Sequence, residues 1–68
     1  MVNQNLLDGY CAMSGMRTNK DIADILGITE QSYINKKKGY QDFKGGEIKL
    51  LIERLSIPED KIVETFFV

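Results

Sequence analysis

The amino-acid sequence predicts an all-α fold, a compact domain of five short helices. Apolar residues recur at spacings of three and four along most of the 68-residue chain, as they do on one face of a helix. Glycine or the single proline separates these periodic stretches, and no stretch is predicted to be a strand. Hydrophobic residues make up 43% of the chain, enough for one small core, so residues 1–68 are expected to form one domain of marginal stability.

The first helix is predicted over residues 5–14, after a frayed start at residues 1–4, and Gly15 is expected to end it. The residues expected to face the core are Leu6, Tyr10 and Met13, with Leu7 and Cys11 on an adjacent stripe. Because Cys11 is the only cysteine, an intrachain disulfide is excluded. Cys11 is expected to be a small buried apolar residue.

Two helices joined by a tight turn are predicted over residues 19–26 and 30–38. Thr18 and Asp21 have the spacing of a capping box at the start of the first. Gly27 suits its end, because a left-handed C-cap costs glycine no Cβ clash, and Thr29 is a good N-cap for the second. The residues expected to pack in and beneath this helix pair are Ile22, Ala23, Ile25, Leu26, Ile28 and Tyr33.

The end of the helix at residues 30–38 and the loop after it are less regular. Lys36 is expected to face inward or along the rim, with its stem covering apolar surface and its ammonium extending into water. Residues 39–46 are predicted to form a mobile loop with a weak cap for the next helix. Phe43 is expected to anchor this loop in the core.

The remaining sequence predicts two more helices. Residues 47–55 have the clearest helical period of the chain, with apolar residues at Ile48, Leu51, Ile52 and Leu55. Pro58 suits the start of the last helix, whose expected apolar face consists of Ile62, Val63, Phe66 and Phe67. Either Phe66 and Phe67 close the core over the first helix, or one of them is exposed as a self-complementary dimer patch.

The charge of the chain is unevenly distributed, although the net charge is only −1. Residues 33–44 contain four lysines and one aspartate, a balance of +3. Residues 45–68 contain three basic and five acidic residues, a balance of −2. The positive charge therefore gathers at the end of the predicted third helix, where it indicates either an anionic partner or a solvated helix C-terminus.

The missing residue types exclude several kinds of chemistry. The chain has no histidine, so Ser-His and Cys-His nucleophilic pairs and most transition-metal sites are excluded. We expect no enzyme activity, no cofactor and no metal. No apolar run exceeds four residues, far short of the roughly 20 that a membrane span needs, so a cytoplasmic protein is expected.

The region from residue 18 to residue 39 resembles the helix-turn-helix of the phage repressor and Cro family, the XRE type. The matching residues are Asn19, Ile22, Ala23, Leu26, Gly27, Ile28, Tyr33 and Gly39. The likeness continues through Phe43, Glu47 and Ile48 to the IVETFF segment, as in small phage-type repressors of Gram-positive bacteria. The resemblance implies a five-helix lambda-repressor-like domain, whose second motif helix lies in the DNA major groove.

The resemblance also implies which residues contact DNA. The expected base-reading residues are Glu30, Gln31, Ile34 and Asn35, and the expected phosphate contacts are Asn19, Thr29, Lys37, Lys38, Tyr40 and Lys44. Gln31 and Asn35 can pair with adenine, and Ile34 can contact a thymine methyl. Glu30 can accept from cytosine, or it can simply stabilise the positive end of the helix dipole.

The expected function is therefore sequence-specific transcriptional regulation, as a phage or prophage repressor or a Cro-like protein. It would bind a palindromic operator as a homodimer, at least on DNA, inside a bacterial or phage-infected cell, with no small-molecule ligand. The net negative charge keeps an alternative open. A protein-binding module of the same fold, antitoxin-like or anti-repressor, would use the acidic C-terminal half to hold a basic partner.

Overall fold

The computed structural model describes residues 2–67, and within that range it has five α-helices, one short 3₁₀ helix and no strand. The elements are α1 Gln4–Met13, α2 Asn19–Leu26, α3 Glu30–Lys38, α4 Gly45–Leu55, the 3₁₀ helix η1 Glu59–Lys61 and α5 Ile62–Phe66. They form a compact body with extents of 29 × 25 × 21 Å. The all-helical prediction is confirmed, and α2 and α3 begin and end at the predicted residues.

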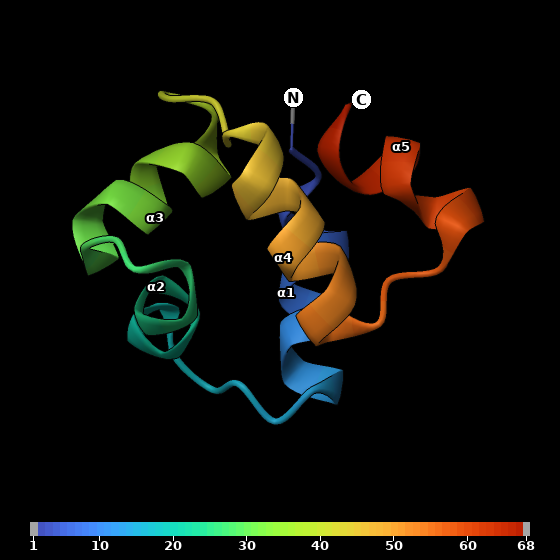
Figure 1. The fold of residues 1–68 in the computed structure, drawn as a ribbon, viewed down its shortest axis with the longest axis horizontal. Helices are drawn as coiled ribbons and strands as arrows, with labels where there is room; N and C mark the ends of the chain where they lie inside the picture. The colour runs from blue at the N-terminus through green and yellow to red at the C-terminus, as the bar shows by residue number, and fades with distance from the viewer. Residues whose placement is uncertain (1, 68) are drawn as a thin grey trace.

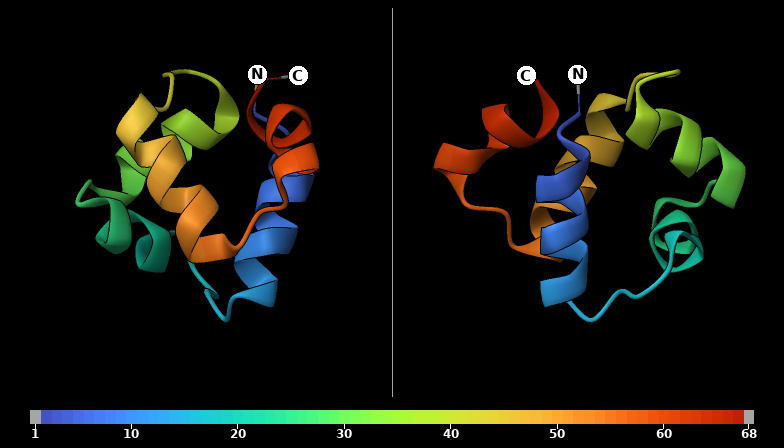
Figure 2. Two further views of the ribbon diagram at one scale, coloured as in Figure 1. Left: turned by 45° about the vertical axis from the view of Figure 1, so that its right-hand side comes forward. Right: turned by 180° about the vertical axis from the view of Figure 1, so that it is seen from behind.

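Helices α1 and α4 lie at the centre of the molecule, with α2 and α3 on one side and α5 on the other (Figure 1). The two ends of the described chain lie close together (Figure 2). The Asn3 N–H donates to the Thr65 carbonyl oxygen at 2.8 Å, and the Asn3 side chain caps α1 by accepting from the Leu6 N–H at 3.2 Å. The expectation of a frayed start is therefore wrong for residues 2–4, and residue 1 lies outside the described range.

The core collects apolar side chains from every helix. Leu7, Ile22, Tyr33 and Leu51 are each at most 1% exposed. Phe43, in the loop before α4, is also buried, as predicted. Its ring lies 6.1 Å from the Tyr33 ring and 6.0 Å from the Phe66 ring, centroid to centroid. Both centroid distances lie within the favourable range for aromatic pairs. The row of three rings therefore connects α3 to α5 through the loop before α4.

The inward face of α1 differs from the prediction. Leu7 and Cys11 are buried, Leu6 and Tyr10 are half-buried, and Met13 is 76% exposed. Two adjacent apolar stripes on one helix allow two rotations about its axis, and its spacing alone cannot choose between them. Packing against the neighbouring helices buries the stripe that contains Leu7 and Cys11. The prediction that Cys11 is a buried apolar residue is confirmed.

The last helix, α5, buries fewer of its apolar residues than predicted. Phe66 is 5% exposed, whereas Val63 and Phe67 are 65% and 58% exposed. Because α5 is only five residues long, it turns a single face to the core, and the second buried residue on that face is Thr65. The Thr65 hydroxyl satisfies its hydrogen-bonding need by donating to the Lys61 carbonyl oxygen at 2.7 Å.

Candidate functional site

Helix α2 begins and ends with the local structures that the sequence predicts. The Thr18 hydroxyl accepts from the Asp21 N–H at 3.2 Å, and the Asp21 carboxylate accepts from the Thr18 N–H at 3.2 Å. This pair is the predicted capping box. Gly27 has a φ of 70°, and the following Ile28 N–H donates back to the Ala23 carbonyl oxygen at 3.0 Å. The left-handed glycine therefore ends α2 and redirects the chain.

Helix α3 follows after three residues and packs against α2. The Thr29 hydroxyl caps it by accepting from the Ser32 N–H at 3.1 Å. Gly39, with a φ of 88°, ends it. Ala23, one of the residues expected to pack in this helix pair, is 1% exposed. The cap and the left-handed glycine therefore set where α3 begins and ends, and α3 packs on α2 between them.

One side of α3 presents the four predicted base-reading residues. Glu30 and Gln31 are exposed, and Ile34 and Asn35 lie one turn further along and are half-buried. The spacing of four places each pair on the same side of the helix. The Gln31 Nε2 donates to the Asn35 Oδ1 at 3.1 Å, so these two amides form one unit. The structure therefore brings all four residues together on one face of one helix.

Most of the predicted phosphate contacts lie around that face. Thr29 is exposed at the start of α3, and Asn19 is half-buried at the start of α2. Lys38, Tyr40 and Lys44 are exposed at the end of α3 and in the loop that follows it. All five are placed at helix ends or in loops, where a backbone phosphate could approach them.

Lys37 is the exception among these residues, because its ammonium already has partners. Its Nζ donates to Asp8 Oδ1 at 3.1 Å and to Asn19 Oδ1 at 3.0 Å, and it lies 5.7 Å from the centre of the Tyr33 ring. Its side chain is only 12% exposed. Lys37 therefore connects α3 to α1 and α2, and it orients the Asn19 amide at the start of α2.

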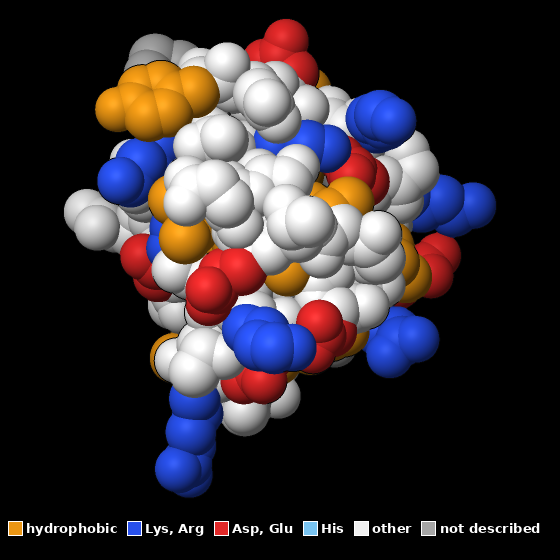
Figure 3. All heavy atoms as spheres, turned by 90° about the vertical axis from the view of Figure 1, so that its left-hand side faces the viewer, with side chains coloured by type: hydrophobic (Ala, Val, Ile, Leu, Met, Phe, Trp, Pro, Cys, Tyr) orange, Lys and Arg blue, Asp and Glu red, His pale blue; other side chains and the backbone are white. Residues whose placement is uncertain are grey.

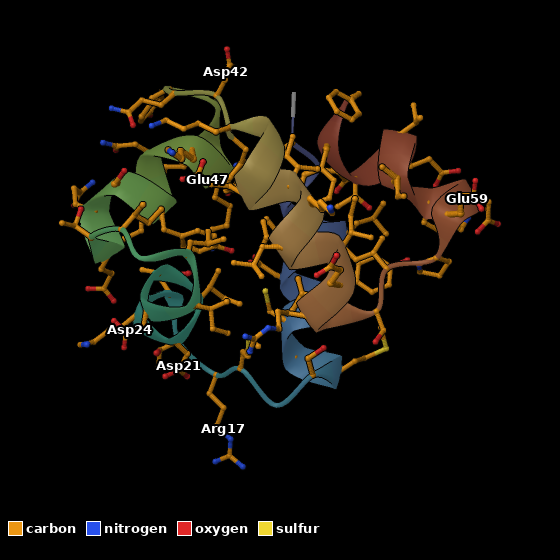
Figure 4. All side chains as sticks on the ribbon, in the orientation of Figure 1. Arg17, Asp21, Asp24, Asp42, Glu47 and Glu59 are labelled. Atoms are coloured by element: carbon orange, nitrogen blue, oxygen red, sulfur yellow. The ribbon has the colours of Figure 1, made fainter. Side chains whose placement is uncertain are left out.

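Lys36 overturns a prediction. We expected its ammonium to extend into water, but the whole residue is 6% exposed. Its Nζ donates to both carboxylate oxygens of Glu47, at 2.6 and 2.8 Å. The physical reason is that Glu47 lies in the first turn of α4, between α3 and α4 (Figure 4), so a carboxylate meets the lysine inside the protein.

The carboxylate of Glu47 also explains why α4 begins at Gly45 rather than at Glu47. Its Oε1 accepts from the Lys44 N–H at 2.8 Å, which satisfies a backbone donor that the weak Lys44-Gly45-Gly46 cap would leave free. Burial by itself would raise the pKa of Glu47. The hydrogen bonds from Lys36 and the Lys44 N–H, with the charges of both lysines, outweigh burial and hold the pKa of Glu47 below its usual value.

These ion pairs change the expected electrostatics of the site. Among the four lysines of residues 33–44, Lys36 and Lys37 are paired with carboxylates, and only Lys38 and Lys44 have ammonium groups without an ion pair in the described residues. The face of the molecule that contains α2 and α3 shows basic and acidic side chains interspersed with uncharged surface (Figure 3). The local positive field is therefore weaker than the sequence balance of +3 indicates.

Sequence reasoning missed the two carboxylates that engage these lysines. Glu47 carries a usable signal, because it stands three residues after Lys44, the spacing of an acidic residue that caps a helix start. Asp8 carries none, because 29 residues separate it from Lys37. Its role depends on how α1 lies against α3, which local sequence does not specify.

The buried pair of Cys11 and Tyr33 lies behind α3. The thiol sulfur and the phenol oxygen are 4.0 Å apart, at the limit of a hydrogen bond to sulfur. Burial raises the pKa of Cys11 and the pKa of Tyr33, so both groups stay protonated at neutral pH. The two side chains fill space between α1 and α3.

Comparison with known proteins gave no match to a protein-family model, to a curated protein or to a solved structure. Within residues 2–67, no helix is both long and apolar enough to cross a membrane. The same residues contain no group of three or more side chains that could hold a metal ion.

Proposed function

We propose that this chain is a sequence-specific DNA-binding transcription regulator, in which α2 and α3 form a helix-turn-helix and α3 enters the major groove. The observation that carries the proposal is the polar face of α3. Glu30, Gln31, Ile34 and Asn35 share that face, on a helix capped at both ends and packed on α2. A helix of this kind fits the roughly 12 Å width of the major groove, where each base pair presents a distinct pattern.

The paired amides of α3 match the edge of an adenine. Gln31 Nε2 donates one of its two N–H groups to Asn35 Oδ1, so the Gln31 Oε1 acceptor and the Asn35 Nδ2 donor are the atoms that this bond leaves wholly open to a partner. An adenine offers one N6 donor and one N7 acceptor in the major groove. Ile34 lies beside this unit and suits a thymine methyl, so an A·T step is the expected target near the centre of α3.

The phosphate contacts would come from residues near the two ends of α3 and at the start of α2. Lys38 is the last residue of α3, Tyr40 and Lys44 follow in the loop after it, and Thr29 lies at its start. Asn19, oriented by Lys37, offers its amide N–H at the start of α2. Such contacts fix the register of the protein on DNA without reading sequence. With few free ammonium groups, one domain would bind weakly, which favours a homodimer on two half-sites about 34 Å apart.

The test of this proposal is selection of bound duplexes from a random pool, followed by titration of the selected duplex at several salt concentrations. We expect a palindromic operator whose affinity falls steeply as salt rises, because phosphate binding releases counterions. If no sequence is enriched and no duplex binds at low salt, DNA binding is refuted. If a palindromic operator is selected and lies at a promoter, we expect the bound protein to exclude polymerase and repress transcription.

Two substitutions separate base reading from phosphate contact on the selected operator. Gln31→Ala should cost about 1–3 kcal/mol of binding free energy and relax the preference at one position of each half-site. Lys38→Ala should weaken binding on all sequences and lower the salt slope by about 1 for each bound domain. Lys61→Ala, on η1 and away from α3, is the matched control. Wild-type binding by both α3 variants would contradict the assigned face.

A second candidate function is protein binding by the same fold, in the manner of an antitoxin or anti-repressor. The observation that favours it is the pairing of Lys36 and Lys37 with carboxylates, which leaves little free positive charge for DNA. The acidic C-terminal region and the exposed Val63 and Phe67 would then contact a basic partner. Protection of α4 and α5 by a co-purified protein, without any duplex binding, is the result that would favour this candidate.

A further inference from the structure

We propose that the buried Lys36–Glu47 ion pair sets the orientation of α3, so that Lys36 and Glu47 are positioning residues for DNA binding and neither touches the DNA. The proposal rests on the function proposed above for α3. It assigns to Lys36 a role opposite to the one that the composition of the lysine run indicates. Lys36 acts on the protein side of α3, as a tie to α4.

Helix α3 needs such a tie because it buries little apolar surface. Its buried residues are Tyr33 and Lys36 alone, and no apolar stripe runs along it. It packs chiefly against α2, while α2 in turn contacts α4. Tyr33 therefore fixes the middle of α3 in the core, and the last turn of α3 has a charged residue where other helices would place an apolar one.

The Lys36–Glu47 pair attracts α3 to α4, and its hydrogen bonds also restrict the orientation of the two side chains. Lys36 Nζ lies 2.6 and 2.8 Å from the two oxygens of Glu47, and Glu47 Oε1 is held a second time by the Lys44 N–H at 2.8 Å. The side chains are only 7% and 12% exposed. Separating the two groups would leave a desolvated charge unpaired, so the last turn of α3 is confined to a narrow range of positions relative to α4.

The position of that last turn determines where the base-reading face points. Gln31 and Asn35 lie on either side of Tyr33 along the same helix, so a pivot about Tyr33 moves both amides. Hydrogen bonds to base edges require donor–acceptor distances of about 2.7–3.2 Å and good alignment. A shift of roughly an ångström in α3 would therefore weaken readout, even though every DNA-contacting residue remained present.

The decisive variant is Lys36→Met/Glu47→Met, which keeps net charge and buried volume close to wild type but removes the directional bonds. Double apolar replacement of a buried ion pair commonly preserves stability. We expect a folded protein whose operator affinity falls about tenfold or more, the loss of roughly one bidentate base contact. The salt slope should stay at the wild-type value, because no phosphate contact is lost.

A matched control and a rescue variant define the comparison. Lys61→Met/Glu64→Met removes an exposed ion pair with the same zero change in net charge, and it should bind like wild type. Lys36→Gln/Glu47→Gln restores a neutral directional hydrogen bond and should recover much of the affinity. Wild-type affinity in the methionine pair would overturn the proposal, as would a salt slope lower by about 1 for each bound domain, which would mean that Lys36 contacts phosphate.

A measurement without DNA keeps this inference separate from the proposed function. Residual dipolar couplings of the free protein report the angle between α3 and α4. The methionine pair should show a changed or averaged angle, and the control pair should show the wild-type angle. An unchanged angle, or a methionine pair that does not fold, would overturn the positioning role. Failure of wild-type protein to bind any duplex would refute only the DNA-binding function.

Discussion

Helices α3 and α4 are held in the molecule by different forces. Helix α4 buries Leu51 and Leu55 and packs Ile48 and Ile52 against the same core. Helix α3 buries Tyr33 but otherwise depends on ammonium groups that bind carboxylates on neighbouring helices. The difference teaches that α4 is held by burial of apolar surface, which has no preferred direction. By contrast, α3 is held by charge-assisted hydrogen bonds, which are directional. A helix held in this way can leave its outer face polar and free for a partner.

The largest expected effect is on the free energy of unfolding, from a change in the apolar core face of α4. Leu51 is fully buried, so Leu51→Ala should lower the free energy of unfolding by about 2–5 kcal/mol through lost burial and a new cavity. A domain of this size has only roughly 3–10 kcal/mol in total. Urea denaturation measures the loss. The neighbouring half-buried Leu50 provides the control, and an equal loss in Leu50→Ala would contradict the assigned core face of α4.

An intermediate effect is expected from pH, and it should act on α3 and on the first turn of α4, which Glu47 ties together. The pKa of Glu47 is lowered in the folded protein, so its contribution to stability is fully present above the unfolded glutamate pKa of about 4.3. That contribution is lost as the pH falls through the lower folded pKa. Hydrogen exchange in acid should show the amides of α3 and of the first turn of α4 losing protection before those around Leu51 and Leu55.

The control for this acid effect is the Lys36→Met/Glu47→Met variant, which has no carboxylate at position 47 to titrate. Its free energy of unfolding, followed by urea denaturation from pH 7 downward, should fall less steeply than that of the wild type. Identical pH profiles for the two proteins would show that the ion pair does not contribute to the acid sensitivity of α3.

The smallest expected effect is a stabilisation at the start of α4. Gly46 lies in its first turn, and a Cβ built there would have no heavy atom within 4 Å. Gly46→Ala should therefore raise the free energy of unfolding by about 0.4–1 kcal/mol, mainly by restricting the unfolded chain. A small rise in the thermal midpoint checks this. A loss of stability would mean that the loop before α4 needs the freedom of glycine.

Local signals in the sequence predicted the backbone of α2 and α3 well. Thr18, Gly27, Thr29 and Gly39 act on neighbours within five residues, and the structure places each at a helix end with the expected bonds or a left-handed backbone. Such features depend on spacing along the chain, which a sequence displays directly. The predicted base-reading residues share a face for the same reason.

The features that sequence could not supply depend on contacts between distant segments. The rotation of α1, the exposure of Phe67 and the pairing of Lys37 with Asp8 follow from how helices lie against one another. The lysine run shows the consequence most clearly. Three adjacent lysines predict a basic surface, but the helical period points Lys36 inward, and a carboxylate from α4 neutralises it.

The most direct test of the central claim, that the exposed face of α3 is a DNA-binding surface, is an NMR titration of ¹⁵N-labelled protein with the selected duplex. We expect the largest amide shift changes in residues 29–35 and 38–44, with side-chain shifts for Gln31 and Asn35. Amides of α5 should change little, apart from any dimer contact. Shift changes confined to α4 and α5, with α3 unperturbed at saturating duplex, would contradict the account.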